Sequence, residues 1–146
     1  MELRGKSIRE LNIVVTQAFD DMDRVQERSW SDGTATVTYT YDGPASQFRL
    51  GRLASIAQGT SLVSYAYNVF GWMTQDGILS YTYDANGNRN TIGYGGGLFA
   101  CYGFDDADRQ STLSLGTDSS CIAGAQSLVT ASSYLAGGPL ASLNTF

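Results

Sequence analysis

The stretch Tyr81-Thr82-Tyr83-Asp84-Ala85-Asn86-Gly87-Asn88-Arg89 recurs in altered form along the 146-residue chain. Two tyrosines two positions apart lie on the same face of a β-strand, and the small residue between them faces the other way. An Asp followed three positions later by Gly is typical of a type I turn, in which the Asp side chain bonds the backbone two residues on. The stretch therefore predicts a strand, a tight turn and the start of a returning strand.

Four other segments share this order of aromatic residue, acidic or amide residue, and turn. The aromatic residue just before the acidic or amide position falls at 19, 41, 67, 83 and 104, and a unit of about 20 residues is typical of repeat proteins. Where Asp23 and Asp108 stand in place of the turn glycine, a short polar side chain can still adopt left-handed backbone. The residues that define the five copies are Phe19, Asp20 and Arg24; Tyr39, Tyr41, Asp42, Gly51 and Arg52; Tyr65, Tyr67, Asn68 and Gly71; Tyr81, Tyr83, Asp84, Gly87 and Arg89; and Phe104, Asp105 and Arg109.

A second set of turns is expected where each returning strand ends, at Asp32-Gly33, Gly59, Asp76-Gly77 and Gly95-Gly96-Gly97. No window shows a sustained helical period with a cap and a stop. The sequence therefore predicts an all-β fold of about ten or more short strands, a meander of antiparallel hairpins that forms a curved, partly open sheet. We expect one repeat region over 1–146, with five recognisable repeats at about 15–113 and a diverged tail at 114–146.

The tail is poor in charge, because Asp118 is the only charged residue after Arg109. Ser, Ala, Gly, Leu and Thr dominate it, so a flexible linker is one interpretation. We favour further strands at Ser127–Tyr134 and Leu140–Leu143, separated by a turn at Gly137-Gly138-Pro139.

Composition excludes several classes of function. Nine basic and fourteen acidic residues give a net charge of −5, which argues against binding to nucleic acid or to an acidic membrane surface. The absence of histidine excludes Ser-His-Asp and Cys-His catalysis and the usual histidine-containing catalytic zinc sites. No apolar stretch has the length of a membrane span or the form of a signal peptide. Cys101 and Cys121 are equally consistent with one disulfide and with two free thiols.

Each feature that could carry chemistry also has a structural interpretation, and we favour the structural one. The tyrosine pairs could stack on sugars, but aromatic residues at period two more often pack one face of a sheet. The clusters Asp20-Asp21-x-Asp23 and Asp105-Asp106-x-Asp108 could hold calcium, but they lack the EF-hand glycine and glutamate, and Arg24 and Arg109 partly neutralise them. Cys101 has no base to activate it as a nucleophile. The Gly93–Gly97 stretch lacks the lysine and helix of a phosphate loop and indicates a hairpin turn. We therefore expect no catalytic residue, no metal site and no cofactor.

The unit Tyr-x-Tyr-Asp-x-x-Gly-Arg-Leu resembles the YD repeat of the Rhs family, which includes bacterial Rhs toxins, the C component of Tc toxins and the teneurins. The best matches are Tyr81–Arg89, Tyr65–Gly71, and Tyr39–Asp42 with Gly51-Arg52-Leu53; the tail segment Tyr134–Leu143 looks like a variant. The resemblance runs from about Thr16 to the C-terminus. It implies a hollow shell of β-strands that encloses a toxin domain or serves surface adhesion, in a secreted or cell-surface protein.

Two departures from the family qualify this resemblance. The family's self-cleaving segment has an Asp-Pro setting, but neither Pro44 nor Pro139 follows an aspartate, so no autoproteolytic residue is carried over. A full shell also uses many more repeats than five, and uncapped repeats expose strand edges. We predict a non-catalytic shell segment whose partners are neighbouring repeats, another copy of itself or an enclosed toxin. The alternative is a stand-alone small β enzyme (a carboxylate-based hydrolase) or a ligand-binding module that uses the repeat as its scaffold.

Overall fold

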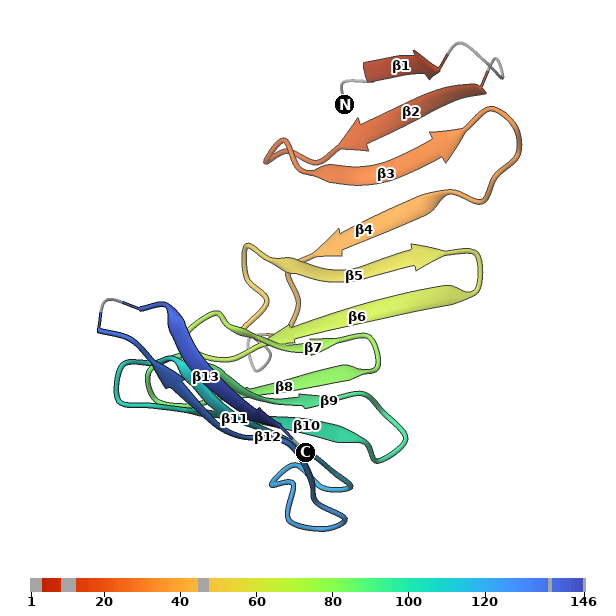
Figure 1. Ribbon diagram of the computed structural model, residues 1–146. Helices are drawn as coiled ribbons and strands as arrows, with labels where there is room; N and C mark the ends of the chain where they lie inside the picture. Colours follow the sequence, from red (N-terminus) through yellow and green to blue (C-terminus); the bar gives the residue numbers. More distant parts are fainter. Residues whose placement is uncertain (1–3, 9–12, 45–47, 137, 146) are drawn as a thin grey trace. The chain divides into compact units, whose positions relative to one another are not determined.

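The computed structural model describes residues 4–8, 13–44, 48–136 and 138–145, and every regular element in them is a β-strand (Figure 1). The chain divides into two compact units, Met1–Gly71 and Trp72–Phe146. The first unit contains β1 (Arg4–Ile8), β2 (Ile13–Phe19), β3 (Val25–Trp30), β4 (Val37–Tyr41), β5 (Leu53–Gln58) and β6 (Ser61–Tyr67). The second contains β7 (Met73–Asp76), β8 (Leu79–Tyr83), β9 (Arg89–Gly93), β10 (Phe99–Phe104), β11 (Gln110–Gly116), β12 (Gln126–Tyr134) and β13 (Leu140–Thr145).

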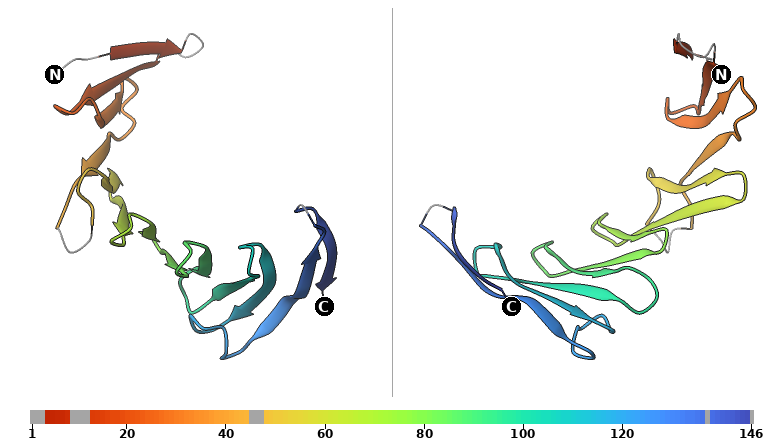
Figure 2. Two further views of the ribbon diagram at one scale, coloured as in Figure 1. Left: turned by 90° about the vertical axis from the view of Figure 1, so that its left-hand side faces the viewer. Right: turned by 45° about the vertical axis from the view of Figure 1, so that its right-hand side comes forward.

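Within each unit, every strand pairs antiparallel with the strand before it and the strand after it in the chain. This holds for β1 to β6 and for β7 to β13. Among the described residues of each unit, no second layer of strands lies against the sheet (Figure 2). The predicted all-β meander of hairpins is confirmed, and the described residues form thirteen strands where ten or more were expected.

Four of the five turns that follow the aromatic positions have the predicted form. The N–H of the fourth turn residue donates to the carbonyl of the first, for example from Asp23 to Asp20 at 3.0 Å and from Gly87 to Asp84 at 3.2 Å. The fourth residue has left-handed backbone, with φ of 83° at Gly71 and 91° at Gly87. Asp23 and Asp108 adopt the same conformation, with φ of 59° and 58°. The prediction that aspartate can replace glycine at this position is therefore confirmed.

A β-bulge follows each of five such turns at the same place. In the first repeat Phe19 pairs with Val25 and Ala18 with Glu27, so one residue of the returning strand has no partner opposite. Such an extra residue bends the strand and increases its twist. The shared form indicates that the repeat specifies the bulge together with the turn. The four equivalent register shifts lie between Thr40 and Tyr41, Thr82 and Tyr83, Gly103 and Phe104, and Ser133 and Tyr134.

The tail forms strands, as predicted, and not a linker. Strands β12 and β13 cover both predicted segments. The N–H of Leu135 donates to the carbonyl of Pro139 at 2.9 Å, which repeats the bond from Asp20 to Arg24 in the first turn. The predicted turn contains residue 137, which lies outside the described residues, but Gly138 and Pro139 belong to it. The tail therefore contains a further turn of this type, in which Leu135 stands where the other turns have an acidic or amide residue.

The described part of the chain has only a small core. Its buried hydrophobic residues are mostly small, and none of its large side chains is fully buried. In β4 and β8 half-buried residues alternate with exposed ones, so both residues of each tyrosine pair lie on one face. Because burial between layers contributes so little here, contacts between successive hairpins must supply much of the stability. The buried hydrophobic residues are Ala18, Ala54, Ile92, Ala100 and Cys121.

Replacing Gly87 with alanine tests how closely the turn glycine is covered. A Cβ at this position would lie 2.8 Å from Cζ2 of Trp72, and φ is also positive. Gly96→Ala is the matched control, because Gly96 has positive φ but open space around it. We expect Gly87→Ala to lower the free energy of unfolding by about 1–3 kcal/mol more than the control, the usual cost of overpacking. Equal losses in chemical denaturation would show that Trp72 does not pack on this turn.

Candidate functional site

A tyrosine of one repeat bonds the backbone of the preceding repeat in the same way four times. In each case the tyrosine hydroxyl donates to the carbonyl of the first residue of the preceding hairpin's returning strand. We call this contact a rung. A rung satisfies a backbone acceptor and joins two successive hairpins. The bonds run from Tyr41 to Val25 (2.9 Å) and Tyr67 to Leu53 (3.0 Å) in the first unit, and from Tyr83 to Met73 (2.7 Å) and Tyr134 to Gln110 (2.6 Å) in the second.

The face of the same tyrosine ring is covered by the residue just before that carbonyl. The guanidinium carbon of Arg24 lies 4.3 Å from the centre of the Tyr41 ring. The corresponding distances are 5.5 Å for Arg52 and Tyr67 and 4.5 Å for Arg109 and Tyr134. These distances are typical of cation–π contacts. At the remaining rung, that of Tyr83, Trp72 takes the arginine's place, and the centres of the two rings lie 5.2 Å apart.

Arg24 also joins the acidic residues of two repeats. Its Nε donates to Oδ2 of Asp20 at 2.7 Å, and its NH2 group donates to Oδ2 of Asp42 at 3.1 Å. Arg109 makes the equivalent ion pair with Asp105 at 2.7 Å. The expectation that these arginines partly neutralise the acidic turns is confirmed.

The acidic residue after each aromatic residue caps its own turn. Oδ1 of Asp20 accepts the N–H groups of Met22 and Arg24 at 3.0 and 2.9 Å. Asp84 and Asp105 accept the N–H groups two and four residues on in the same way. The N–H of Arg24 holds the pKa of Asp20 below its usual value, and the Arg109 side chain does the same for the pKa of Asp105. The carboxylate therefore stays ionised at neutral pH and fixes the turn.

Burial raises the pKa of Tyr41 and of Tyr83. Both hydroxyls therefore remain protonated well above neutral pH and keep the hydrogen that the rung requires.

The insertion in the second repeat does not disrupt its turn. The N–H of Asp42 donates to the carbonyl of Arg52 at 2.9 Å, and the N–H of Gly51 donates to Oδ1 of Asp42 at 2.5 Å. A Cβ at Gly71 would collide with the guanidinium of Arg52. The structure thus brings together the predicted residues Asp42, Gly51, Arg52 and Gly71.

Arg89 does not occupy the place that the repeat pattern assigns to it. The N–H of Asp84 donates to the carbonyl of Asn88 at 2.9 Å, so Asn88 is the equivalent of Arg24 and Arg109. Arg89 comes one residue later, and its guanidinium carbon lies 5.3 Å from the ring centre of Tyr81, in its own repeat. In the next repeat Phe104 stands at the position of the rung tyrosine, and it forms no rung because it has no hydroxyl. The prediction that Arg89 is the arginine of the repeat is therefore wrong, because in this copy the arginine follows the acidic residue one position later than Arg24 and Arg109 do in theirs.

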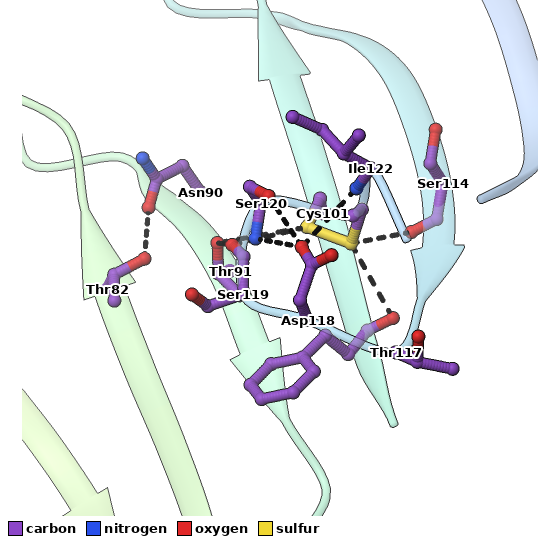
Figure 3. The surroundings of a disulfide bond; sticks show 12 residues. Thr82, Asn90, Thr91, Cys101, Ser114, Thr117, Asp118, Ser119, Ser120 and Ile122 are labelled. Carbon is purple, nitrogen blue, oxygen red and sulfur yellow. Dashed lines mark hydrogen bonds between the residues drawn. A yellow bond between two sulfur atoms is a disulfide. The ribbon is translucent and has the colours of Figure 1, made fainter. Parts of the chain in front are cut away.

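A disulfide fixes the loop between β11 and β12 to strand β10 (Figure 3). Cys101 of β10 bonds Cys121 of the loop, which resolves the alternative left open by the sequence. The Thr91 hydroxyl, from β9, also donates to the carbonyl of Ser119 at 3.3 Å. A disulfide that closes a loop of this size stabilises a fold by about 3 kcal/mol. The disulfide and the Thr91 hydrogen bond together attach the loop to two neighbouring strands, β10 and β9.

Asp118 organises the inside of this loop (Figure 3). Its Oδ1 accepts from the N–H and the hydroxyl of Ser120 at 2.8 and 2.5 Å, and its Oδ2 accepts from the N–H of Ala123 at 2.7 Å. The Ser120 hydroxyl is the largest influence that lowers the pKa of Asp118 to about 2. The sequence analysis noted Asp118 only as a lone charge, although Asp followed two residues later by Ser is typical of a side-chain-capped turn.

Among the described residues, no group of three or more Cys, Asp or Glu side chains is placed to hold a metal ion. That part of the chain also contains no helix long and apolar enough to cross a membrane.

The comparisons with known proteins support the fold alone. No family model matches the chain, and no curated protein matches it. Its structure is similar to one chain of the crystal structure of TcdB2-TccC3-Cdc42, with a TM-score of 0.73 and 11% sequence identity. The similarity covers 92% of this chain and 8% of that chain, so this chain spans a small part of the length of its structural neighbour.

Removing one rung hydroxyl should destabilise the fold measurably. We expect Tyr41→Phe to lower the free energy of unfolding by about 1 kcal/mol, because the carbonyl of Val25 loses its hydrogen bond while the ring stays in place. Tyr39→Phe, in the same strand, is the control and should cost less. If urea denaturation gives the two variants equal stability, the hydroxyl contact has no structural role.

The Asp118 carboxylate should make stability depend on acidic pH. Its pKa is about 2 in the folded protein and about 3.9 when unfolded, so the unfolded chain binds more protons between these values. Stability is therefore present above pH 4 and falls as the pH drops toward 2. We expect Asp118→Asn to be less stable at neutral pH and to lose less stability over that acidic interval. Asp106→Asn removes the same charge from an exposed turn, and an identical pH profile for the two variants would contradict this role.

Proposed function

We propose that the chain is a non-catalytic structural segment of a Rhs-like β shell. The observation that carries this proposal is the rung, which joins one hairpin to the next without a hydrophobic core. The similarity to a chain of the TcdB2-TccC3-Cdc42 structure supports a shell-like sheet. The YD-type repeat supports the same assignment, since the arginine, tyrosine and aspartate of the motif are the residues that form the rungs and turns.

The carboxylates are poorly suited to the alternative function of a hydrolase. A general acid needs a carboxyl group whose pKa is raised toward neutrality. Hydrogen bonds instead lower the pKa of Asp20, Asp42 and Asp105. The pKa of Asp84 is lowered as well. Burial raises it, but the hydrogen bonds from Asn88, Asn86 and Gly87 together lower it by more. Each of these carboxylates accepts backbone hydrogen bonds within its own turn.

Strand β13 supplies the surface through which such a segment would join its partners. All six of its residues are exposed, and the strand contains neither a charged residue nor a proline. An uncharged edge strand of this kind presents unpaired backbone groups to any further strand. The proposed partner is another strand of the same kind, from a neighbouring repeat or from a second copy of the chain.

The disulfide supports a location outside the reducing cytosol. Cys101 and Cys121 are bonded to each other, and such bonds persist in secreted and surface proteins. A secreted or cell-surface protein, as the family resemblance implies, is therefore the location we propose.

Sedimentation velocity over a wide range of concentration tests the proposed edge pairing. We expect the 146-residue chain to self-associate and Leu143→Lys to weaken the association constant about tenfold, because a charge on an edge strand opposes pairing. Leu135→Lys is the matched control, since it adds the same charge to an exposed turn residue. A wild-type chain that stays monomeric at the highest concentration, or equal effects of the two lysines, would contradict the proposal.

A further inference from the structure

A cavity of about 360 Å³ opens in the second unit where the regular rung is missing. It is lined by Gly87, Asn88, Arg89, Tyr102, Phe104 and Gln110. Its size falls within the range of small-molecule sites, and its lining combines aromatic rings with a few polar groups.

The cavity coincides with two substitutions in the repeat. At the complete rungs an arginine side chain lies over a tyrosine ring, as Arg24 does over Tyr41 and Arg109 over Tyr134. Here the shorter Asn88 stands in the arginine position, and Phe104 stands in the tyrosine position. Asparagine does not extend as far as arginine, so the face of the Phe104 ring has no guanidinium over it.

The polar groups that an arginine would bind are retained. Arg24 donates to the acidic residue of its own repeat and to that of the next. Nδ2 of Asn88 also joins two repeats, donating to Oδ2 of Asp84 at 3.0 Å and to Oδ1 of Asp108, the fourth turn residue of the next repeat, at 2.7 Å. A neutral amide leaves the charges of these carboxylates uncompensated, whereas a guanidinium would compensate them.

The charge around the cavity also favours a cation. Its two flanking turns carry four carboxylates, Asp84, Asp105, Asp106 and Asp108. The only cationic residues beside them are Arg89 and Arg109, and Arg109 is paired with Asp105. Arg89 itself lines the cavity and contributes repulsion. Its guanidinium lies over Tyr81, however, and the two flanking turns carry more carboxylates than cations.

We infer that this cavity binds a guanidinium cation in the place of the missing arginine. The planar cation stacks on the Phe104 ring and donates to Asp108 and to the side-chain oxygens of Asn88 and Gln110. A guanidinium fits better than an ammonium ion, because it is planar, stacks on aromatic rings and offers several donors in one plane. The ligand is a small guanidino compound or an arginine side chain of a polypeptide. This inference is independent of the proposed shell function.

Titration of the full chain with agmatine, followed by backbone amide NMR, tests the inference. We expect saturable shifts at Gly87, Arg89 and Gln110, and weaker binding of cadaverine, which has ammonium groups at both ends. The double variant Asn88→Arg/Phe104→Tyr supplies the missing rung from within the chain. It should weaken agmatine binding about tenfold or more, the equivalent of one lost charge-assisted contact. An end-blocked Gly-Arg-Gly peptide that binds more tightly than agmatine would identify a polypeptide ligand, and equal or weaker binding a small molecule.

A second variant keeps the inference testable if the double variant does not fold. Asp108→Asn should weaken agmatine binding about threefold or more, because it removes the carboxylate beside the lining residue Asn88. Asp21→Asn, in the turn of the first repeat, removes the same charge and should leave binding unchanged. Shifts that do not saturate, binding that is unchanged in the double variant or in Asp108→Asn, or equal binding of cadaverine would overturn the inference.

Discussion

The hydrogen bond from a tyrosine hydroxyl to the backbone carbonyl of the preceding hairpin is the contact on which this structure depends. Most sheets are stabilised by a second layer that buries one face, but the described residues form little buried core. The rung compensates by joining successive hairpins through a hydroxyl bond and a ring-face contact. At Tyr41 both contacts are present, with Val25 as the acceptor and Arg24 over the ring. This double requirement explains why the repeat combines tyrosine with arginine, and why Trp72 can replace the arginine, since an indole also covers the ring.

The turn places the rung residues, and its own requirements account for the rest of the repeat. The carboxylate of Asp20 holds the N–H groups of its turn, and the left-handed residue at position 23 directs the chain back. The bulge that follows is repeated at five hairpins. Glycine is needed at Gly87 for two reasons, because φ is positive and because Trp72 covers the turn. The aspartates of the motif therefore have structural roles, which agrees with a shell segment better than with an acid–base enzyme.

Much of this architecture could be predicted from sequence, because strand alternation and turn chemistry are local. The hairpins, both sets of turns and the strands of the tail follow from such patterns. The rungs could not be predicted, because they join residues far apart in sequence, such as Tyr134 and Gln110. The misplacement of Arg89 has the same origin, since only the hydrogen bond of Asp84 to Asn88 shows where the turn ends. The disulfide was undecided because two cysteines in one chain carry no information on their distance, and the cavity at Phe104 arises from the absence of a contact.

Arginine and tyrosine of successive repeats should stabilise each other if the rung holds the hairpins together. A double-mutant cycle on Arg24→Met and Tyr41→Leu in the full chain measures this coupling most directly, because both substitutions retain apolar volume while removing the cation and the ring. We expect the losses of stability in the two single variants not to add up to the loss in the double variant. The coupling free energy should be about 0.5–1 kcal/mol in favour of the native pair. Strictly additive losses would mean that the ring and the guanidinium lie side by side without stabilising each other, and would contradict the account.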